Sequence, residues 1–239
     1  MEWLGVLQYK SLPLLDKAII KCTDCPRLVE WREEVAITKR KAYENEKYWG
    51  KPVAGFGPSD AKILIVGLAP GAHGANRTGR IFTGDSSGDW LYRSLHNAGL
   101  AKLPTSTGVS DGQELIHTRI TCAVHCVPPD NKPSTEEKHA CNKYLSEEIR
   151  LMMPSIRVFL ALGNFAWNSL FTTLSELGEE LPKPRLKFGH NVKTTFTGSD
   201  GVKRYLLASY HPSQQNTFTR KLTHEQLDKI MMSASNLAN

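Results

Sequence analysis

Four short apolar runs, separated by segments with helical periodicity, constrain the fold of this chain most strongly. The runs lie at residues 62–68, 117–124, 157–162 and 205–210. Each is largely apolar on both faces, as expected for a central strand covered by helices on both sides of its sheet. Strands that alternate with helices favour βαβ units with right-handed crossovers. The sequence therefore predicts an α/β fold with a parallel sheet.

The segments between the apolar runs carry the helical patterns. Helices are predicted at residues 87–98, 134–153, 164–177 and 223–233. The second of these opens with Ser134 three residues before Glu137, which is the spacing of a capping box. Residues 181–201 are rich in proline, glycine and lysine and predict a hairpin or a long loop.

Length and composition bound the class of protein. A chain of 239 residues with 40% hydrophobic residues can bury an ample core, so we expect one domain over residues 1–239. Lys and Arg outnumber Asp and Glu by 30 to 24, and the net charge of +6 suits a polyanionic partner. No apolar run approaches the ~20 residues of a membrane span, and residues 1–4 do not resemble the start of an export signal. We expect a cytoplasmic location and no membrane association.

Four of the five cysteines are drawn from distant segments, namely Cys22, Cys25, Cys126 and Cys141. An odd number of cysteines in a reducing compartment is poorly explained by disulfides. Four thiolates can close one site, and soft sulfur ligands select zinc or an iron–sulfur cluster. The spacing does not decide between the two. In an extended strand, Cys122 lies about 13 Å from Cys126 and is left out of the site.

Ligands of parallel α/β sheets bind beyond the carboxyl ends of the strands, and unusual segments follow three of the four predicted strands. The first, at residues 67–85, contains five glycines that can turn backbone amides toward an anion. It lacks the spacing of a dinucleotide fingerprint and of a P-loop. The alternative is a long loop whose glycines only satisfy turns.

The other two segments each present one polar side chain. In CVPPDNKP, at residues 126–133, the prolines fix Asn131, whose amide can read the edge of a pyrimidine. The alternative is a turn asparagine before a helix. In the segment at 209–218, His211 leaves a strand beside a proline and can donate a hydrogen bond or stabilise negative charge. A structural histidine is the alternative.

These pieces together resemble the uracil-DNA glycosylase superfamily, specifically its family 5, the B type. The resemblance is carried by GLAPGAHGANRTGRIFTGD at 67–85, CVPPDNKP at 126–133, SYHPSQQNTFTRKLT at 209–223 and the four cysteines. It implies a three-layer αβα sandwich around a four-stranded parallel sheet. It also implies a monofunctional enzyme that flips uracil out of DNA and hydrolyses its N-glycosidic bond in base excision repair.

The resemblance implies a structural 4Fe-4S cluster on Cys22, Cys25, Cys126 and Cys141, with zinc on the same thiols as the alternative. No divalent cation is expected in the chemistry. The expected partner is uracil-containing DNA, the protein is expected to be a monomer, and a sliding-clamp partner is left open. No lysine occupies a motif position suited to a Schiff base, so no lyase step is expected.

The site residues implied by the resemblance have distinct roles. Phe82 stacks on the extruded base and Asn131 pairs with its edge. His211 hydrogen-bonds the base oxygen and stabilises the charge that develops on the leaving base, helped by backbone amides between Gly67 and Gly71.

Water activation is the open part of this site. Many superfamily members carry an Asn, Asp or Glu where this chain has Leu68, Ala69 and Pro70. Family 5 shows the same absence, and its proposed substitute carboxylate matches Asp85. The alternative is that Asp85 only stabilises the N-terminus of a helix. The apolar first motif also predicts tolerance for hypoxanthine and related deaminated purines.

Contacts to the DNA backbone are expected from polar residues beside the motifs, namely Arg77, Arg80, Ser213, Asn216, Arg220 and Lys221. Lys183, Arg185 and Lys187 form a candidate outer strip. Two other functions stay open: a metal-thiolate nucleic-acid-binding module without catalysis, and an α/β hydrolase. The hydrolase lacks support because no G-x-S-x-G elbow is present.

Overall fold

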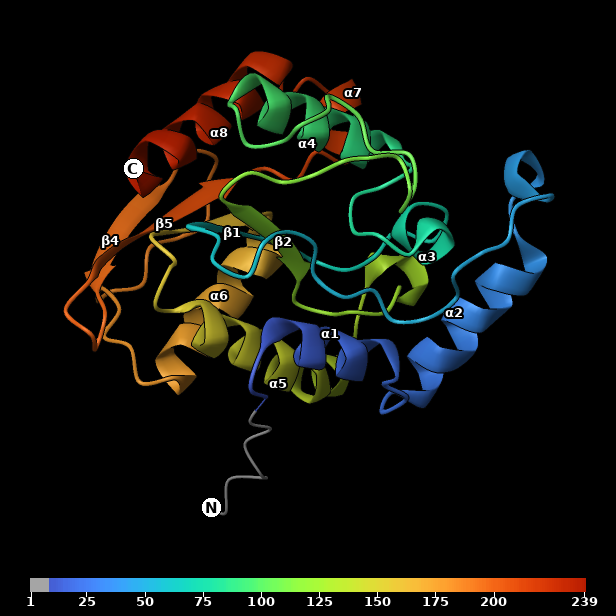
Figure 1. Ribbon diagram of the computed structural model, residues 1–239, viewed down its shortest axis with the longest axis horizontal. Helices are drawn as coiled ribbons and strands as arrows, with labels where there is room; N and C mark the ends of the chain where they lie inside the picture. Colours follow the sequence, from blue (N-terminus) through green and yellow to red (C-terminus); the bar gives the residue numbers. More distant parts are fainter. Residues whose placement is uncertain (1–8) are drawn as a thin grey trace.

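The computed structural model describes residues 9–239 (Figure 1). The first eight residues, including the N-terminal stretch 1–4 considered above, lie outside the described residues. Within 9–239, no helix combines the length and apolar composition needed to cross a membrane.

A five-stranded sheet forms the centre of the fold, with strand order β2-β1-β3-β5-β4. The strands are β1 (Ile63–Gly67), β2 (Thr118–Cys122), β3 (Val158–Leu162), β4 (Lys193–Thr197) and β5 (Lys203–Ser209). The pairs β1–β2, β1–β3 and β3–β5 are parallel, and β4 pairs antiparallel with β5. The four predicted runs are the four parallel strands.

The expected number of four strands is wrong by one. The fifth strand, β4, lies inside the segment 181–201 and forms a hairpin with β5. Its sequence KTTFT is polar, and only Phe196 is buried, so it does not show the apolar run of a central strand. Its place at the edge of the sheet is the physical reason, because an edge strand in a hairpin does not need apolar residues on both faces.

Helices cover both faces of the sheet. They are α1 (Leu12–Ile20), α2 (Pro26–Thr38), α3 (Ala75–Thr78), α4 (Ser86–Asn97), α5 (Thr135–Met152), α6 (Asn164–Glu176), α7 (Gln214–Phe218) and α8 (His224–Ala238). Figure 1 shows α4 and α8 over one face and α1, α5 and α6 under the other. The fold is a three-layer α/β sandwich.

Alternate residues of β1 supply the two cores. Leu64 and Val66 belong to the core beneath α1, α5 and α6, whereas Ile63 and Ile65 belong to the core beneath α4 and α8. All four are fully buried. Because successive strand side chains point to opposite faces, a strand covered on both sides must be apolar at every position.

The four predicted helices are present with shifted ends. The capping box at Ser134 is formed: its Oγ accepts from the Glu137 backbone N–H, and the Glu137 carboxylate accepts from the Ser134 N–H. The last helix continues to Ala238, five residues beyond its predicted end, because Met231, Ala234 and Ala238 keep burying its inner face.

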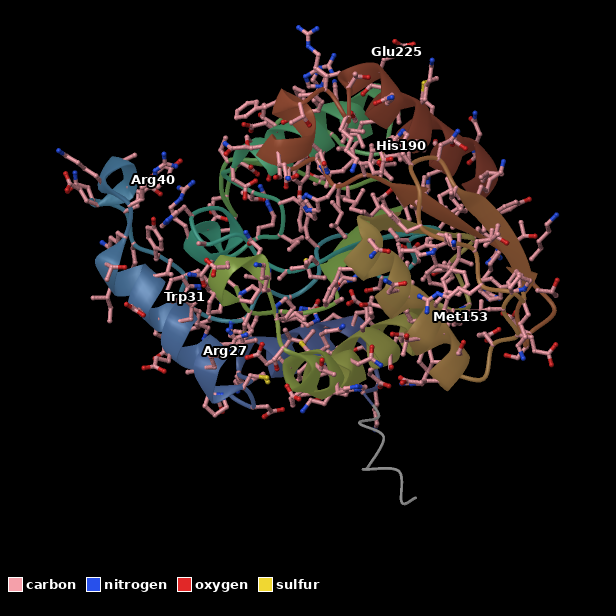
Figure 2. All side chains as sticks on the ribbon, turned by 180° about the vertical axis from the view of Figure 1, so that it is seen from behind. Arg27, Trp31, Arg40, Met153, His190 and Glu225 are labelled. Carbon is pink, nitrogen blue, oxygen red and sulfur yellow. The ribbon has the colours of Figure 1, made fainter. Side chains whose placement is uncertain are left out.

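The sequence patterns did not predict α1, α2, α3 or α7. The first two begin beside prolines, which are tolerated in the first turn, and they flank the turn that holds Cys22 and Cys25. Figure 2 shows Arg27 and Trp31 along α2, with Arg40 beyond its far end. The segment after α2 contacts the glycine-rich loop, where Trp49 N–H donates to the Arg77 carbonyl at 2.9 Å.

Candidate active site and cysteine cavity

The segments that follow the parallel strands meet at one edge of the sheet. Backbone N–H groups of Ala123 and Val124, after β2, donate to the carbonyls of Gly67 and Leu68, each at 3.0 Å. Gly163, after β3, donates to the Ser209 carbonyl of β5 at 2.8 Å. The three segments singled out in the sequence therefore emerge from the same edge of the sheet.

Phe82 and His211 come together at this edge although they lie 129 positions apart in sequence. Their ring centroids lie 5.6 Å apart with the planes tilted by 32°. Phe82 is 7% exposed and His211 is half-buried. An aromatic face and an imidazole in contact are the elements that an unstacked planar base needs for stacking and for hydrogen bonding.

Tight packing fixes the position of Phe82. Its backbone φ is 50°, a left-handed conformation that is costly for a bulky residue and is typical of functional sites. A Cβ on Gly67 would lie 3.0 Å from the ring atom Cε2. A Cβ on Gly88 would lie 2.1 Å from the Phe82 carbonyl oxygen. Both glycines are required by the close approach of Phe82.

His211 is held as a neutral imidazole. Burial lowers the pKa of His211 to about 4, since the desolvated ring disfavours the charged form. The Asn216 side chain anchors the backbone by donating from Nδ2 to the His211 carbonyl at 2.8 Å. At neutral pH, one ring nitrogen is therefore a donor and the other an acceptor.

Asp85 caps a helix and also faces the glycine-rich loop. Its Oδ1 accepts from the Gly88 N–H at 2.9 Å. Asp85 therefore does stabilise the N-terminus of α4, the role given above as the alternative. Its Oδ2 lies against the loop. A Cβ added at Gly74 would lie 1.9 Å from this oxygen, and one added at Gly71 would lie 2.9 Å from it. Burial raises the pKa of Asp85, with the Gly88 hydrogen bond opposing the shift.

Asn131 is exposed and belongs to a short 3-10 turn, Pro129–Asn131. Its φ of 56° follows a φ of 53° at Asp130, so two consecutive residues are left-handed. Among the described residues, no side-chain hydrogen bond fixes its amide. The structure brings Phe82 and His211 into contact, whereas no contact within residues 9–239 joins Asn131 to either of them.

Arg77 and Arg80 were expected to contact the DNA backbone, but both side chains are buried. Arg77 is 8% exposed and donates to the carbonyls of His73 and Gly84, each at 2.7 Å, and to Glu46. Its guanidinium also covers the Tyr43 ring. These partners occupy the donors that a phosphate would need.

The second arginine is engaged in the same way. Arg80 is 5% exposed and donates to Thr83 Oγ1 at 3.1 Å, to Ser106 Oγ at 2.6 Å and to Asp111. Arg77 and Arg80 hold the 67–85 loop in shape, and this placement argues against direct phosphate contacts by either.

The other residues expected to contact the DNA backbone lie in residues 213–221, which we call the α7 segment because it contains α7. Ser213 caps α7 by accepting from the Asn216 N–H, and Asn216 anchors His211. Arg220 and Lys221 are exposed, and Lys221 lies over the Tyr210 ring at 4.6 Å. Sequence reasoning missed Phe218, which is 79% exposed in the same segment; an aromatic side chain within a motif of small polar residues was the available signal.

With this geometry in view, comparison with known proteins decides the family. The sequence model of the uracil DNA glycosylase superfamily matches residues 54–234. The chain belongs to this superfamily.

Its similar relatives are type-5 uracil-DNA glycosylases. The protein of that name from Mycobacterium bovis is 50% identical over 228 residues, covering 95% of this chain and 82% of its own length. The Thermus thermophilus protein is 46% identical over 222 residues, 93% of this chain and 96% of its own. The Pyrobaculum aerophilum protein is 40% identical over 217 residues, 91% of this chain and 89% of its own. The resemblance seen in the sequence is confirmed.

In this uracil DNA glycosylase superfamily chain, the four expected ligands line a single cavity. Cys22, Cys25, Cys126 and Cys141 surround a small, partly open cavity. All five cysteines are free. Cys122 lies in the opposite core, beneath α4 and α8, whereas the other four contact the core beneath α1, α5 and α6.

The surroundings of these thiols suit a negatively charged metal–thiolate group. Arg32, 3% exposed, donates to Cys126 Sγ and to the Cys22 carbonyl, each at 3.2 Å. The backbone N–H of His125 donates to Cys141 Sγ at 3.3 Å. Burial raises the pKa of Cys126 to about 11, with Arg32 opposing the shift, so this thiol keeps its proton at neutral pH unless a bound metal ion displaces it.

The identity of a metal group is not given by this arrangement. Within residues 9–239, no three His, Cys, Asp or Glu side chains are grouped closely enough to hold one metal ion.

Proposed function

We propose that this protein is a monofunctional uracil-DNA glycosylase that flips uracil out of DNA and hydrolyses its N-glycosidic bond in base excision repair. The observation that carries the proposal is the contact between Phe82 and the neutral His211 where the strand-end loops meet. The type-5 glycosylases at 40–50% identity support it. We also propose that it acts on DNA in the cytoplasm and that it acts as a monomer.

The residues match the charges that the reaction creates. Cleavage leaves an oxocarbenium-like sugar and puts negative charge on the departing base. His211 donates a hydrogen bond to the base oxygen where this charge develops, and backbone amides between Gly67 and Gly71 assist. A neutral donor fits this role, because it needs no compensating charge in a desolvated site.

Asp85 is our candidate for activating the water. The buried carboxylate has a raised pKa and is therefore a stronger base than an exposed one. Its Oδ1 is used by the helix cap, which leaves Oδ2, beside Gly71 and Gly74, to orient the water. Capping and water activation are thus compatible roles of one side chain.

Asn131 is proposed to read the base edge. Its amide offers both donors and an acceptor, the reverse of the pattern on uracil, and lacks a competing partner within the described chain. Apolar Leu68, Ala69 and Pro70 leave little polar discrimination around the base. We therefore propose that the enzyme also removes hypoxanthine. A strict preference for uracil over hypoxanthine in duplex oligonucleotides would refute this.

The DNA backbone is proposed to lie along the α7 segment. Ser213, Arg220 and Lys221 provide a hydroxyl and two exposed cations for phosphate contacts. Phe218, with 79% of its side chain exposed, is placed to fill the gap that the extruded base leaves in the stack. No lyase step is proposed, since the motifs contain no lysine at the reacting position.

The four cysteines around the cavity are proposed to hold a structural 4Fe-4S cluster. Bound there, it would tie the turn between α1 and α2 to the segment after β2 and to α5. The matched variants are Cys141→Ser, which removes a ligand, and Cys122→Ser, which changes a buried thiol in the other core. Only the first should lose iron and visible absorbance in the blue. Stoichiometric zinc in the fresh protein would refute the iron assignment.

Alkali treatment after incubation tests the function. The protein is incubated with a duplex carrying one uracil and, as a control, with the same duplex carrying thymine, and both are heated in alkali. Cleavage at the uracil alone is expected. Tight binding without cleavage would favour the noncatalytic nucleic-acid-binding module instead.

A further inference from the structure

One buried arginine joins the cysteine cavity to the glycine-rich loop. Arg32 lies on α2 and donates from Nη1 to Cys126 Sγ and to the Cys22 carbonyl, each at 3.2 Å. The Arg32 carbonyl accepts from Asn76 Nδ2 at 3.2 Å. Figure 1 shows α2 beside α3, the short helix that carries Asn76. The same turn of α2 is therefore bonded to two of the four cysteines and to the loop.

Asn76 holds the part of the loop that faces the candidate water-activating carboxylate. Its backbone N–H donates to the Gly71 carbonyl at 3.0 Å, and its own carbonyl accepts from the Gly50 N–H at 3.0 Å. Gly71 and Gly74 are the two glycines that lie against Asp85 Oδ2. A displacement of Asn76 therefore moves the backbone beside this oxygen.

Two polar atoms at this junction have no hydrogen-bond partner within the described residues. They are Arg32 Nε and Asn76 Oδ1, and both are buried. The first is a donor and the second an acceptor, so the two side chains are complementary in hydrogen bonding. An unpaired buried group calls for an explanation beyond stability, because it carries the full cost of its lost hydration. Arg32 and Asn76 are thus placed where a stability role alone would favour apolar residues.

The buried charge of Arg32 needs an anion that the side chains nearby do not supply. Its Nη2 lies 3.7 Å from the carboxylate of Glu33, which is too far for a hydrogen bond, and Glu33 is exposed. A cation that is 3% exposed is costly unless it is paired. The metal–thiolate group proposed for the cysteines provides this pairing through Cys126 Sγ. The position of Arg32 therefore depends on that group.

We propose that Arg32 is a positioning residue of the reaction, and that it makes the placement of the glycine-rich loop depend on the metal group of the cysteines. It acts through Asn76 and not on the base itself. The inference rests on the proposed glycosylase function for its effect on the rate, and on the proposed cluster for the counter-charge. A misplacement of about 1 Å at the reacting atoms slows a reaction by up to about 10²-fold, so a small displacement along this path is sufficient.

Three variants separate the two ends of the path from a general loosening of α2. Arg32→Met removes the bonds to the cysteines, and Asn76→Ala removes the bond on the loop side. Arg27→Met is the matched control, because Arg27 also lies on α2 but donates to Glu137 and to the Lys132 carbonyl, away from the loop. Iron per chain and absorbance in the blue are measured first for the parent and each variant.

Hydrogen exchange at the Asn76 amide reports on the loop. Loss of about one hydrogen bond along the path should speed this exchange about fivefold. We expect this in Arg32→Met and Asn76→Ala, and not in Arg27→Met. The single-turnover rate of uracil release should fall about tenfold in the same two variants, with the half-saturating duplex concentration unchanged. The double variant should be no slower than the slower single variant, because both changes break one path.

The reduction potential of the cluster is a readout that a purely structural arginine would not move. Hydrogen bonds to the sulfurs tune this potential, and a cationic donor at Cys126 Sγ raises it. Arg32→Met should therefore lower the midpoint potential, whereas Asn76→Ala and Arg27→Met should leave it unchanged. Arg32→Lys keeps a buried cation and should recover most of the rate.

Normal exchange and rate in Asn76→Ala, equal effects in Arg27→Met, or fully additive losses in the double variant would overturn the proposal. Asn76→Ala changes no contact of a cysteine and decides the outcome if Arg32→Met does not fold. Absent uracil release in the parent protein would count against the glycosylase function instead, and amide exchange and the potential would still decide the proposal.

Discussion

The charge state of His211 gives the sharpest prediction. Burial lowers the pKa of this imidazole from 6.5 to about 4. This lowering of the pKa corresponds to a free-energy cost of about 3 kcal/mol for charging the ring in the folded protein. At pH 5, about nine in ten molecules should still carry a neutral His211, whereas an ordinary histidine would be almost fully charged.

This magnitude separates two mechanisms. If neutral His211 donates to the departing base, the single-turnover rate of uracil release from a duplex should be flat between pH 6 and about 8. If the imidazolium were the active form, the rate should rise about tenfold for each unit of pH lowered in this window, because its population would rise in that proportion. A tenfold rise per unit that disappears in His211→Gln would refute the neutral donor.

The same shift predicts how stability depends on pH. The unfolded chain takes up the His211 proton near pH 6.5 and the folded chain only near pH 4, so the contribution of His211 to stability falls as pH decreases through this interval. The His211→Gln variant should lose less free energy of unfolding between these limits, by up to about 3 kcal/mol and less where the half-buried ring is hydrated. Urea titrations at several pH values measure this difference, and parallel curves would contradict the burial of the ring.

Three further predictions concern other residues. Asp85→Asn should slow uracil release about 10² to 10⁴-fold while duplex binding and stability persist, because Asn also caps helices well; near-normal release would remove Asp85 from the mechanism. Gly67→Ala should slow uracil release about fivefold or more, because the added Cβ pushes against the Phe82 ring. Gly108→Ala, with open space around its Cβ, should release uracil at the parent rate. Equal rates for the two variants would show that the ring position is unimportant. Asp16 lies on α1 and pairs with Arg119. Burial raises the pKa of Asp16 to about 6, so its own contribution to stability should fall by up to about 3 kcal/mol as pH rises from about 4 to 6, opposite in sign to that of His211. In urea titrations the free energy of unfolding of Asp16→Asn, relative to the parent protein, should therefore rise over this interval; a constant difference would contradict this.

The sequence predicted the parts of the fold that depend on local burial. The four parallel strands were found because residues such as Leu64 and Ile65 are apolar on both faces of one strand. The edge strand β4 was foreseen only as the hairpin alternative for residues 181–201, because four of its five residues are not buried and it is held by pairing with β5. Pairing across a sheet leaves no local signal in a polar segment.

The resemblance named Phe82 and His211, and the structure places their rings 5.6 Å apart. Both lie in segments that follow parallel strands, whose carboxyl ends share one edge of the sheet. The burial of Arg77 and Arg80 could not be read from the motif, since their acidic partners Glu46 and Asp111 each lie 31 positions away. An arginine beside a motif looks the same in sequence whether it contacts DNA or braces a loop.

The most direct test of the central claim is a crystal structure of the protein with duplex DNA that carries one 2′-fluoro-deoxyuridine, whose glycosidic bond resists cleavage. We expect the uracil to leave the helix and stack on Phe82, with the Asn131 amide on its edge and a His211 ring nitrogen on its oxygen. A uracil that stays within the duplex, or that binds away from Phe82 and His211, would contradict it.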